Sequence, residues 1–237
     1  MSKQKGKKEF KVAIYANEYK QICAWVLKNE VLETGGDLFG LWSSDHTAVV
    51  QLVLGPGKDC RRAEHSFYQD VDYLEEVGSH LIEKEGVCHI GEWHSHHTIG
   101  LNRPSGGDEG TVWRNMPRYG LHRFLLFIAN IEQQTAVSIG CFLFEFDGET
   151  NRKLPVMQGT FHLLPNESPF RSKCLSVLEK GSEDMNSDEE VSLLQEKSAE
   201  EIEKDVKRPG FVVLPSRKRR GSVISDDIPP RVKRDCY

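Results

Sequence analysis

Two apolar stretches, Arg123-Phe-Leu-Leu-Phe-Ile-Ala-Asn130 and Val137-Ser-Ile-Gly-Cys-Phe-Leu-Phe-Glu-Phe146, decide the fold class. Each is rich in aliphatic and aromatic residues, and each has the length of a β-strand. A strand that is apolar along its whole length is buried on both faces. Because other segments have helical patterns, we expect a layered α/β domain of about 150 residues around these strands.

Further elements are expected on the N-terminal side of these strands. The patterns predict strands at residues 10–14, 37–42, 48–54 and 88–96. Helices are expected to start at the capping residues Asn17, Asp70 and Ser105, the last one extending to residue 119. This mixture of strands and helices supports the α/β assignment.

The charge pattern of the sequence changes beyond Pro165. Residues 179–205 hold 11 acidic against 3 basic residues, and residues 207–234 hold 9 basic against 2 acidic residues. Such charge blocks bury too little apolar area to offset the entropy of ordering the chain. We therefore expect a flexible basic N-terminus at 1–9, one domain at 10–165 and a mostly disordered tail at 166–237.

Composition narrows the class of protein. The 237-residue chain has a formal net charge of -5, which excludes a wholly basic nucleic-acid-binding protein, so nucleic acid is not an expected partner. No apolar run reaches the roughly 18 residues of a membrane-spanning helix, and the basic N-terminus lacks the apolar region of a secretory signal. The six cysteines form no CxxC pair, which favours reduced thiols. We expect a cytoplasmic or nuclear protein without a membrane partner.

The candidate chemistry lies in residues 91–108. His94 and His96 are two residues apart, and residues i and i+2 of a strand share a face, so their imidazoles can converge on one point. With Asp108 from the start of a helix, they form a plausible zinc donor set that leaves one position for water. Ser105 and Asp108 also have the spacing of a helix capping box, and the two roles are compatible.

Two neighbouring residues leave alternatives open. His97 is another candidate ligand, although on a strand it would face away from His96. Glu92 shares the face of His94, where it is either an outer carboxylate that orients a ligand or the partner of a nearby arginine.

A third element lies far away in the sequence. Together, Glu33-x-x-Gly-x-x-x-Gly40, His94-x-His96 and Ser105-x-x-Asp108 resemble the motif of the JAMM/MPN zinc metallopeptidases, especially the compact JAB-type members. The resemblance covers roughly residues 10–147. It implies the three-layer cytidine-deaminase-like fold of that family, a more specific form of the α/β assignment.

The resemblance also implies a role for each residue. His94, His96 and Asp108 would hold one Zn²⁺ per chain. Glu33 would act as general base and later protonate the leaving amine. Ser105 would stabilise the oxyanion of the substrate.

The activity implied is that of a zinc-dependent isopeptidase. It would hydrolyse the isopeptide or peptide bond after the C-terminus of ubiquitin or a ubiquitin-like modifier, with modified proteins as partners. The alternative is a catalytically inactive MPN-fold scaffold. A non-haem iron oxygenase also uses two histidines and one carboxylate. A zinc deaminase requires a CxxC pair that the chain lacks.

Short motifs in the tail suggest regulation. The segment Pro215-Ser-Arg217-Lys-Arg-Arg220 resembles a monopartite nuclear-import signal, which would bind an import receptor through Arg217 to Arg220. Ser222 follows basic residues and Ser187 precedes acidic residues, so both are phosphorylation candidates.

Overall fold

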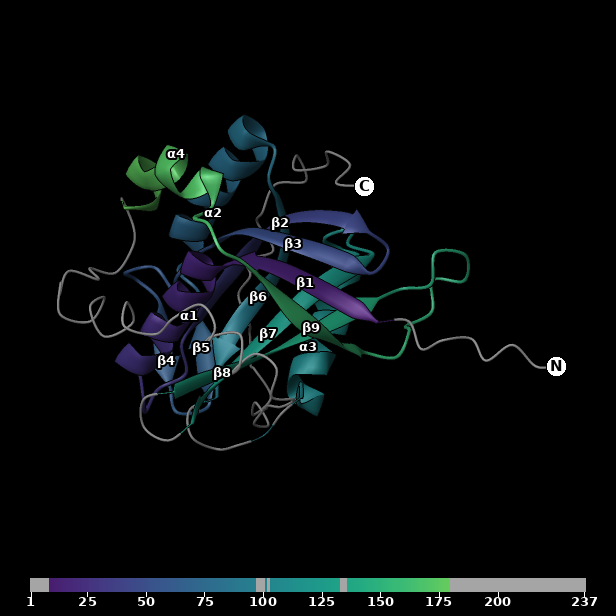
Figure 1. The fold of residues 1–237 in the computed structure, drawn as a ribbon. Coiled ribbons are helices and arrows are strands. Elements are labelled where there is room, and N and C mark those ends of the chain that lie inside the picture. The colour runs from purple at the N-terminus through teal and green to yellow at the C-terminus, as the bar shows by residue number, and fades with distance from the viewer. Residues whose placement is uncertain (1–8, 97–100, 102, 133–135, 180–237) are drawn as a thin grey trace.

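The computed structural model describes residues 9–96, 101, 103–132 and 136–179 (Figure 1). The strands are β1 (Phe10–Tyr15), β2 (Gly35–Ser44), β3 (Thr47–Val53), β4 (Arg61–Ala63), β5 (Ser66–Tyr68), β6 (Cys88–Ser95), β7 (Arg123–Glu132), β8 (Ala136–Glu145) and β9 (Met157–Leu164). The helices are α1 (Ala16–Lys28), α2 (Val71–His80), the π-helix η1 (Leu81–Glu85), α3 (Gly106–Arg118) and α4 (Pro169–Leu178). None of these helices is both long enough and apolar enough to cross a lipid bilayer.

Seven strands form a closed barrel in the order β1-β3-β2-β6-β7-β8-β9, and β4 and β5 form a separate hairpin. β1 pairs in parallel with β3 and β9, and β6 pairs in parallel with β7, whereas the other pairs are antiparallel. The expected three-layer cytidine-deaminase-like fold is therefore wrong. The sheet closes on itself in a mixed barrel instead of forming the open middle layer of a sandwich.

The strand that closes the barrel, β9, is not predicted from the sequence. It pairs with β1 along the whole length of that strand, but with β8 at only two positions. Its residues alternate between half-buried and exposed, so it has no long apolar run. A Cβ atom on Gly159 would lie 2.5 Å from Cδ1 of Phe10, so this position needs glycine for β9 to approach β1.

The two apolar stretches do form buried strands, β7 and β8. In β7, Leu125 and Phe127 pack in the same apolar cluster as residues of α1. The intervening Leu126 packs in a second cluster with Val112 and Met116 of α3. The predicted burial of these strands on both faces is confirmed.

Helix starts follow local capping chemistry, with one exception. The carboxylate of Asp70 accepts a hydrogen bond from the backbone N–H of Tyr73 (3.1 Å), which confirms it as the cap of α2. Ser105 caps α3 as predicted. The prediction of Asn17 as a cap is wrong, because α1 already begins at Ala16, directly after β1.

Helix α4 lies beyond the boundary expected at residue 165. The buried carboxylate of Glu18 in α1 accepts hydrogen bonds from the backbone N–H of Val53 (2.7 Å) and from the guanidinium of Arg171 in α4. The same guanidinium donates to the carbonyl oxygen of Val53 (3.0 Å). These contacts tie α4 to α1 and β3. Of the expected flexible N-terminus at 1–9, residues 1–8 lie outside the described residues. The same holds for residues 180–237, which include Ser187, Ser222 and the basic segment from Arg217.

Replacing Arg171 by glutamine is expected to lower the free energy of unfolding by about 3 kcal/mol, because it leaves the buried charge of Glu18 without its cationic partner. Urea unfolding measures the change. Lys173→Gln is the matched control on the same helix. Its ammonium is largely exposed and pairs with Glu85 at 3.4 Å, so its loss should cost under about 1 kcal/mol. Equal effects of the two substitutions would contradict the assigned role of Arg171.

Candidate metal centre

Strand β6 brings the two histidines together at its C-terminal end. It lies between β2, with which it is antiparallel, and β7, with which it is parallel. The chain then continues in an extended path, because the backbone N–H of His96 donates to the carbonyl of Ala129 in β7 (2.9 Å). The ring centroids of His94 and His96 are 4.6 Å apart, and both residues are buried. The predicted convergence of the two imidazoles is therefore present.

Asp108 reaches the same point from the first turn of α3. One carboxylate oxygen, Oδ2, accepts hydrogen bonds from the backbone N–H (2.9 Å) and the hydroxyl (2.7 Å) of Ser105. The other oxygen, Oδ1, lies 3.5 Å from Nε2 of His94. The Ser105 hydroxyl also accepts hydrogen bonds from the backbone N–H groups of Gly107 and Asp108. The capping box therefore fixes the carboxylate that faces the histidines.

The three residues present a donor set that fits a metal ion. One ligand atom from each of His94, His96 and Asp108 lies within 4.8 Å of the other two. A tetrahedral ion with bonds of about 2.0–2.2 Å holds its ligands roughly 3.5 Å apart. Small side-chain rotations would bring the three donors to that spacing. Two imidazoles and one carboxylate suit zinc and other first-row divalent ions.

The electrostatics of the site couple His94 to Asp108. Burial lowers the pKa of His94, but the hydrogen bond and charge of Asp108, with the charges of Glu33 and Glu92, outweigh burial and raise it. Burial also acts to raise the pKa of Asp108, but the hydrogen bond and charge of His94 hold it well below its usual range. Asp108 is therefore an ionised carboxylate at neutral pH, and below its raised pKa His94 would release a proton on binding a metal ion.

Glu33 lies in the loop that leads into β2. Its side chain is buried, and its backbone N–H donates to the carbonyl of Ala63 in β4 (3.0 Å). Its negative charge contributes to the raised pKa of His94, which places it in the electrostatic environment of the site. Glu92 on β6 acts on His94 in the same way. His97 lies outside the described residues, so the structure does not address its role as an alternative ligand.

Thr34 and Ser95 are two site residues that are not predicted from the sequence. The backbone N–H of Thr34 donates to the Ser95 hydroxyl (3.0 Å), and the backbone N–H of Ser95 donates to the Thr34 carbonyl (2.7 Å). Both residues are fully buried. Since Glu33 precedes Thr34 and Ser95 lies between the histidines, this reciprocal pair fixes the Glu33 loop beside the donor set. Its partners are far apart in the sequence, so no local pattern identifies it.

No family model matches the chain. Over 79 residues, the chain is 33% identical to a protein of Sinorhizobium fredii named "probable metalloprotease"; this region is 32% of the chain and 48% of that protein. The chain thus matches about half the length of this relative. Among solved structures, protein DSY2949 from Desulfitobacterium hafniense is similar with a TM-score of 0.49 and 18% identity, over 66% of this chain and 94% of that one.

Replacing Ser95 by alanine is expected to lower the free energy of unfolding by about 1–3 kcal/mol, because it leaves the buried N–H of Thr34 without its acceptor. Urea unfolding measures this loss. Ser138→Ala is the matched control, since the shielded Ser138 hydroxyl makes no hydrogen bond within the described residues, and it should change stability by under about 0.5 kcal/mol. A neutral Ser95→Ala variant would refute the locking role.

The affinity of the site for a divalent cation is expected to fall as the pH is lowered. Because the pKa of His94 is raised, the ring is protonated below that value and must release its proton on binding. Below the pKa of His94, the Kd for the cation should rise about tenfold for each unit by which the pH falls, per displaced proton. Competition with a chelator across mildly acidic to mildly alkaline pH measures this slope. His89→Gln is the control, because that imidazole pairs with Asp37 (2.9 Å) and is not among the three donors. A pH-independent Kd in the unsubstituted protein would contradict the coupling.

Proposed function

We propose that the chain is a zinc-dependent peptidase that hydrolyses an isopeptide or peptide bond. The observation that carries this proposal is the convergence of His94, His96 and Asp108, together with a buried Glu33 whose charge acts to raise the pKa of His94. The similarity to a protein named as a metalloprotease supports the general class, a metal-dependent hydrolase. The finer assignment rests on the resemblance of the sequence motif to the JAMM/MPN zinc isopeptidases.

His94, His96 and Asp108 are the residues that would hold the ion. A zinc ion in such a set lowers the pKa of a bound water to about 7 and polarises a carbonyl group. Glu33 would accept the proton of the attacking water and transfer it to the leaving amine nitrogen. Its buried position suits this task, because a carboxyl group held in place can accept a proton in one step and donate it in the next.

Ser105 is proposed to donate its hydroxyl hydrogen to the scissile carbonyl oxygen as that oxygen gains negative charge. In the structure this hydroxyl donates to Oδ2 of Asp108. The same oxygen also accepts the backbone N–H of Ser105. Asp108 would therefore keep one of these hydrogen bonds if the hydroxyl turned toward a substrate.

The proposed substrates are proteins that carry ubiquitin or a ubiquitin-like modifier, with cleavage after the C-terminus of the modifier. This substrate class follows from the motif resemblance. The proposed import receptor would bind the segment from Arg217 to Arg220, in the cytoplasm before nuclear entry. The inactive-scaffold alternative is less well supported, because the chain keeps a converging donor set together with a buried acid.

Replacing Glu33 by glutamine is expected to preserve metal binding and to lower the hydrolysis rate by about 10²–10⁴-fold, the usual contribution of a positioned general acid–base. Zinc-loaded full-length chain and its variants are incubated with a panel of ubiquitin-like isopeptides, and metal content is measured in parallel. Glu30→Gln is the control in the same loop, because Glu30 is exposed and should not affect turnover.

Two outcomes would overturn the proposal. Cleavage at the full rate by Glu33→Gln would exclude the assigned base. Metal binding without turnover on every isopeptide and peptide in the panel would favour the scaffold.

A further inference from the structure

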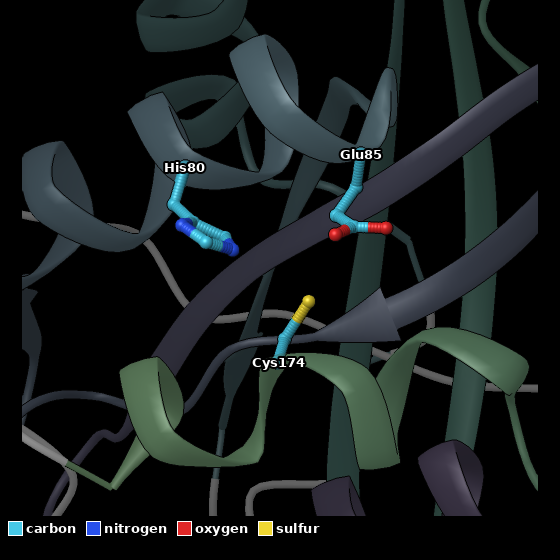
Figure 2. Close-up of side chains that lie close together, drawn as sticks. All are labelled: His80, Glu85 and Cys174. Atoms are coloured by element: carbon cyan, nitrogen blue, oxygen red, sulfur yellow. The ribbon is translucent and has the colours of Figure 1, made fainter.

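A second cluster of metal-ligating side chains lies away from the first, between α2 and α4. It consists of His80 at the end of α2, Glu85 at the end of η1 and Cys174 in the middle of α4. One ligand atom from each lies within 4.8 Å of the other two. Figure 2 shows the imidazole and the carboxylate approaching the Cys174 sulfur from the opposite side of the gap between the helices.

The π-helix explains how His80 and Glu85 come to share a side. In an α-helix, residues five apart lie about 140° apart around the axis, because a turn takes 3.6 residues. Hydrogen bonds of a π-helix run between residues five apart, so such residues lie close to one full turn apart. The helix changes from α to π immediately after His80, and Glu85 is the last residue of the π segment. π-Helical turns are rare in proteins, and those that occur often lie at functional sites.

Helix α4 places the sulfur independently of any ion. The Arg171–Glu18 contact holds the N-terminal part of α4. At its end, the hydroxyl of Tyr73 in α2 donates to the carbonyl of Leu178 (3.3 Å). Burial raises the pKa of Tyr73 to about 12, so this hydroxyl remains a donor at neutral pH. Cys174 is therefore held opposite His80 and Glu85 by contacts outside the cluster.

Cys174 is a fully buried free thiol in an apolar cluster, which by itself describes an ordinary packing cysteine. The difference here is that a nitrogen and an oxygen donor converge on it. His80 and Glu85 are only partly buried, so the cluster is reachable from the surface. Glu85 also meets the ammonium of Lys173 at 3.4 Å, but an ion pair with so exposed a lysine is weak and is readily exchanged.

We propose that His80, Glu85 and Cys174 bind a second divalent cation, zinc or a similar transition-metal ion. This ion would link α4 to the α2–η1 segment. A sulfur, a nitrogen and an oxygen donor form a set that zinc accepts, with a fourth coordination position left for water. Binding breaks the S–H bond of Cys174, releases the proton to solvent and forms a metal–sulfur bond. This site does not depend on the proposed hydrolytic function.

Cobalt(II) titration of the full-length chain tests the proposal, because a cobalt–thiolate bond gives a strong near-ultraviolet charge-transfer absorption. The centre at His94, His96 and Asp108 contains no sulfur, so it does not give this band. The unsubstituted protein is expected to show the band and to bind two ions per chain. Cys174→Ser should lose the band and bind one ion, whereas His94→Ala/His96→Ala should keep the band and bind one ion.

Further variants separate ligation from folding. Cys60→Ser removes a partly exposed cysteine outside the cluster and should keep the band. His80→Gln and Glu85→Gln alter only partly buried side chains, so these variants should fold, and each should raise the cobalt Kd of the sulfur site at least about tenfold. Added metal should raise the melting temperature of the unsubstituted protein more than that of His80→Gln.

The proposal fails if the unsubstituted chain shows no thiolate band, or if the band survives unchanged in Cys174→Ser. It also fails if His80→Gln and Glu85→Gln bind cobalt as tightly as the unsubstituted protein. If the unsubstituted chain shows the thiolate band but no peptidase activity, that result would count against the function proposed for the first site and not against the second site.

Discussion

The pairing of β6 between β2 and β7 is the constraint on which the candidate metal centre depends. The backbone hydrogen bonds on either side fix the path of β6, so His94 and His96 emerge at one point. The same pairing brings the start of β2 beside the end of β6, where Thr34 and Ser95 exchange two hydrogen bonds. A shift of this register by one residue would turn the side chain of His94 to the other face of the sheet.

Helices that pack on the barrel supply further metal-ligating side chains to the candidate sites. The first turn of α3 presents Asp108, and its capping box leaves one carboxylate oxygen for the histidines. Farther away, α4 is anchored by the buried Glu18–Arg171 contact and faces α2 across the cluster at Cys174. Figure 1 shows α2 and α4 close together, with α3 on a different part of the sheet. Each candidate site thus combines side chains from segments that lie far apart in the sequence.

Local patterns predicted much of the secondary structure and part of the first site. The caps Asp70 and Ser105, the buried strands β7 and β8, and the His94–His96 pair are all short-range features. The fold class was wrong because closure depends on β9, whose residues alternate between half-buried and exposed and include Gly159, so that they form no apolar run. The boundary at residue 165 also left α4 outside the domain, although it packs against α2.

The sequence by itself determined the features whose partners lie within a few residues: a capping box at i and i+3, and two imidazoles on one face at i and i+2. Only the tertiary structure decided which distant groups meet them. It locked Thr34 to Ser95, closed the barrel with β9 and brought Cys174 opposite His80 and Glu85. The physical reason is that these contacts depend on strand register and helix packing, which are settled by the burial of the whole core and leave no local spacing to recognise.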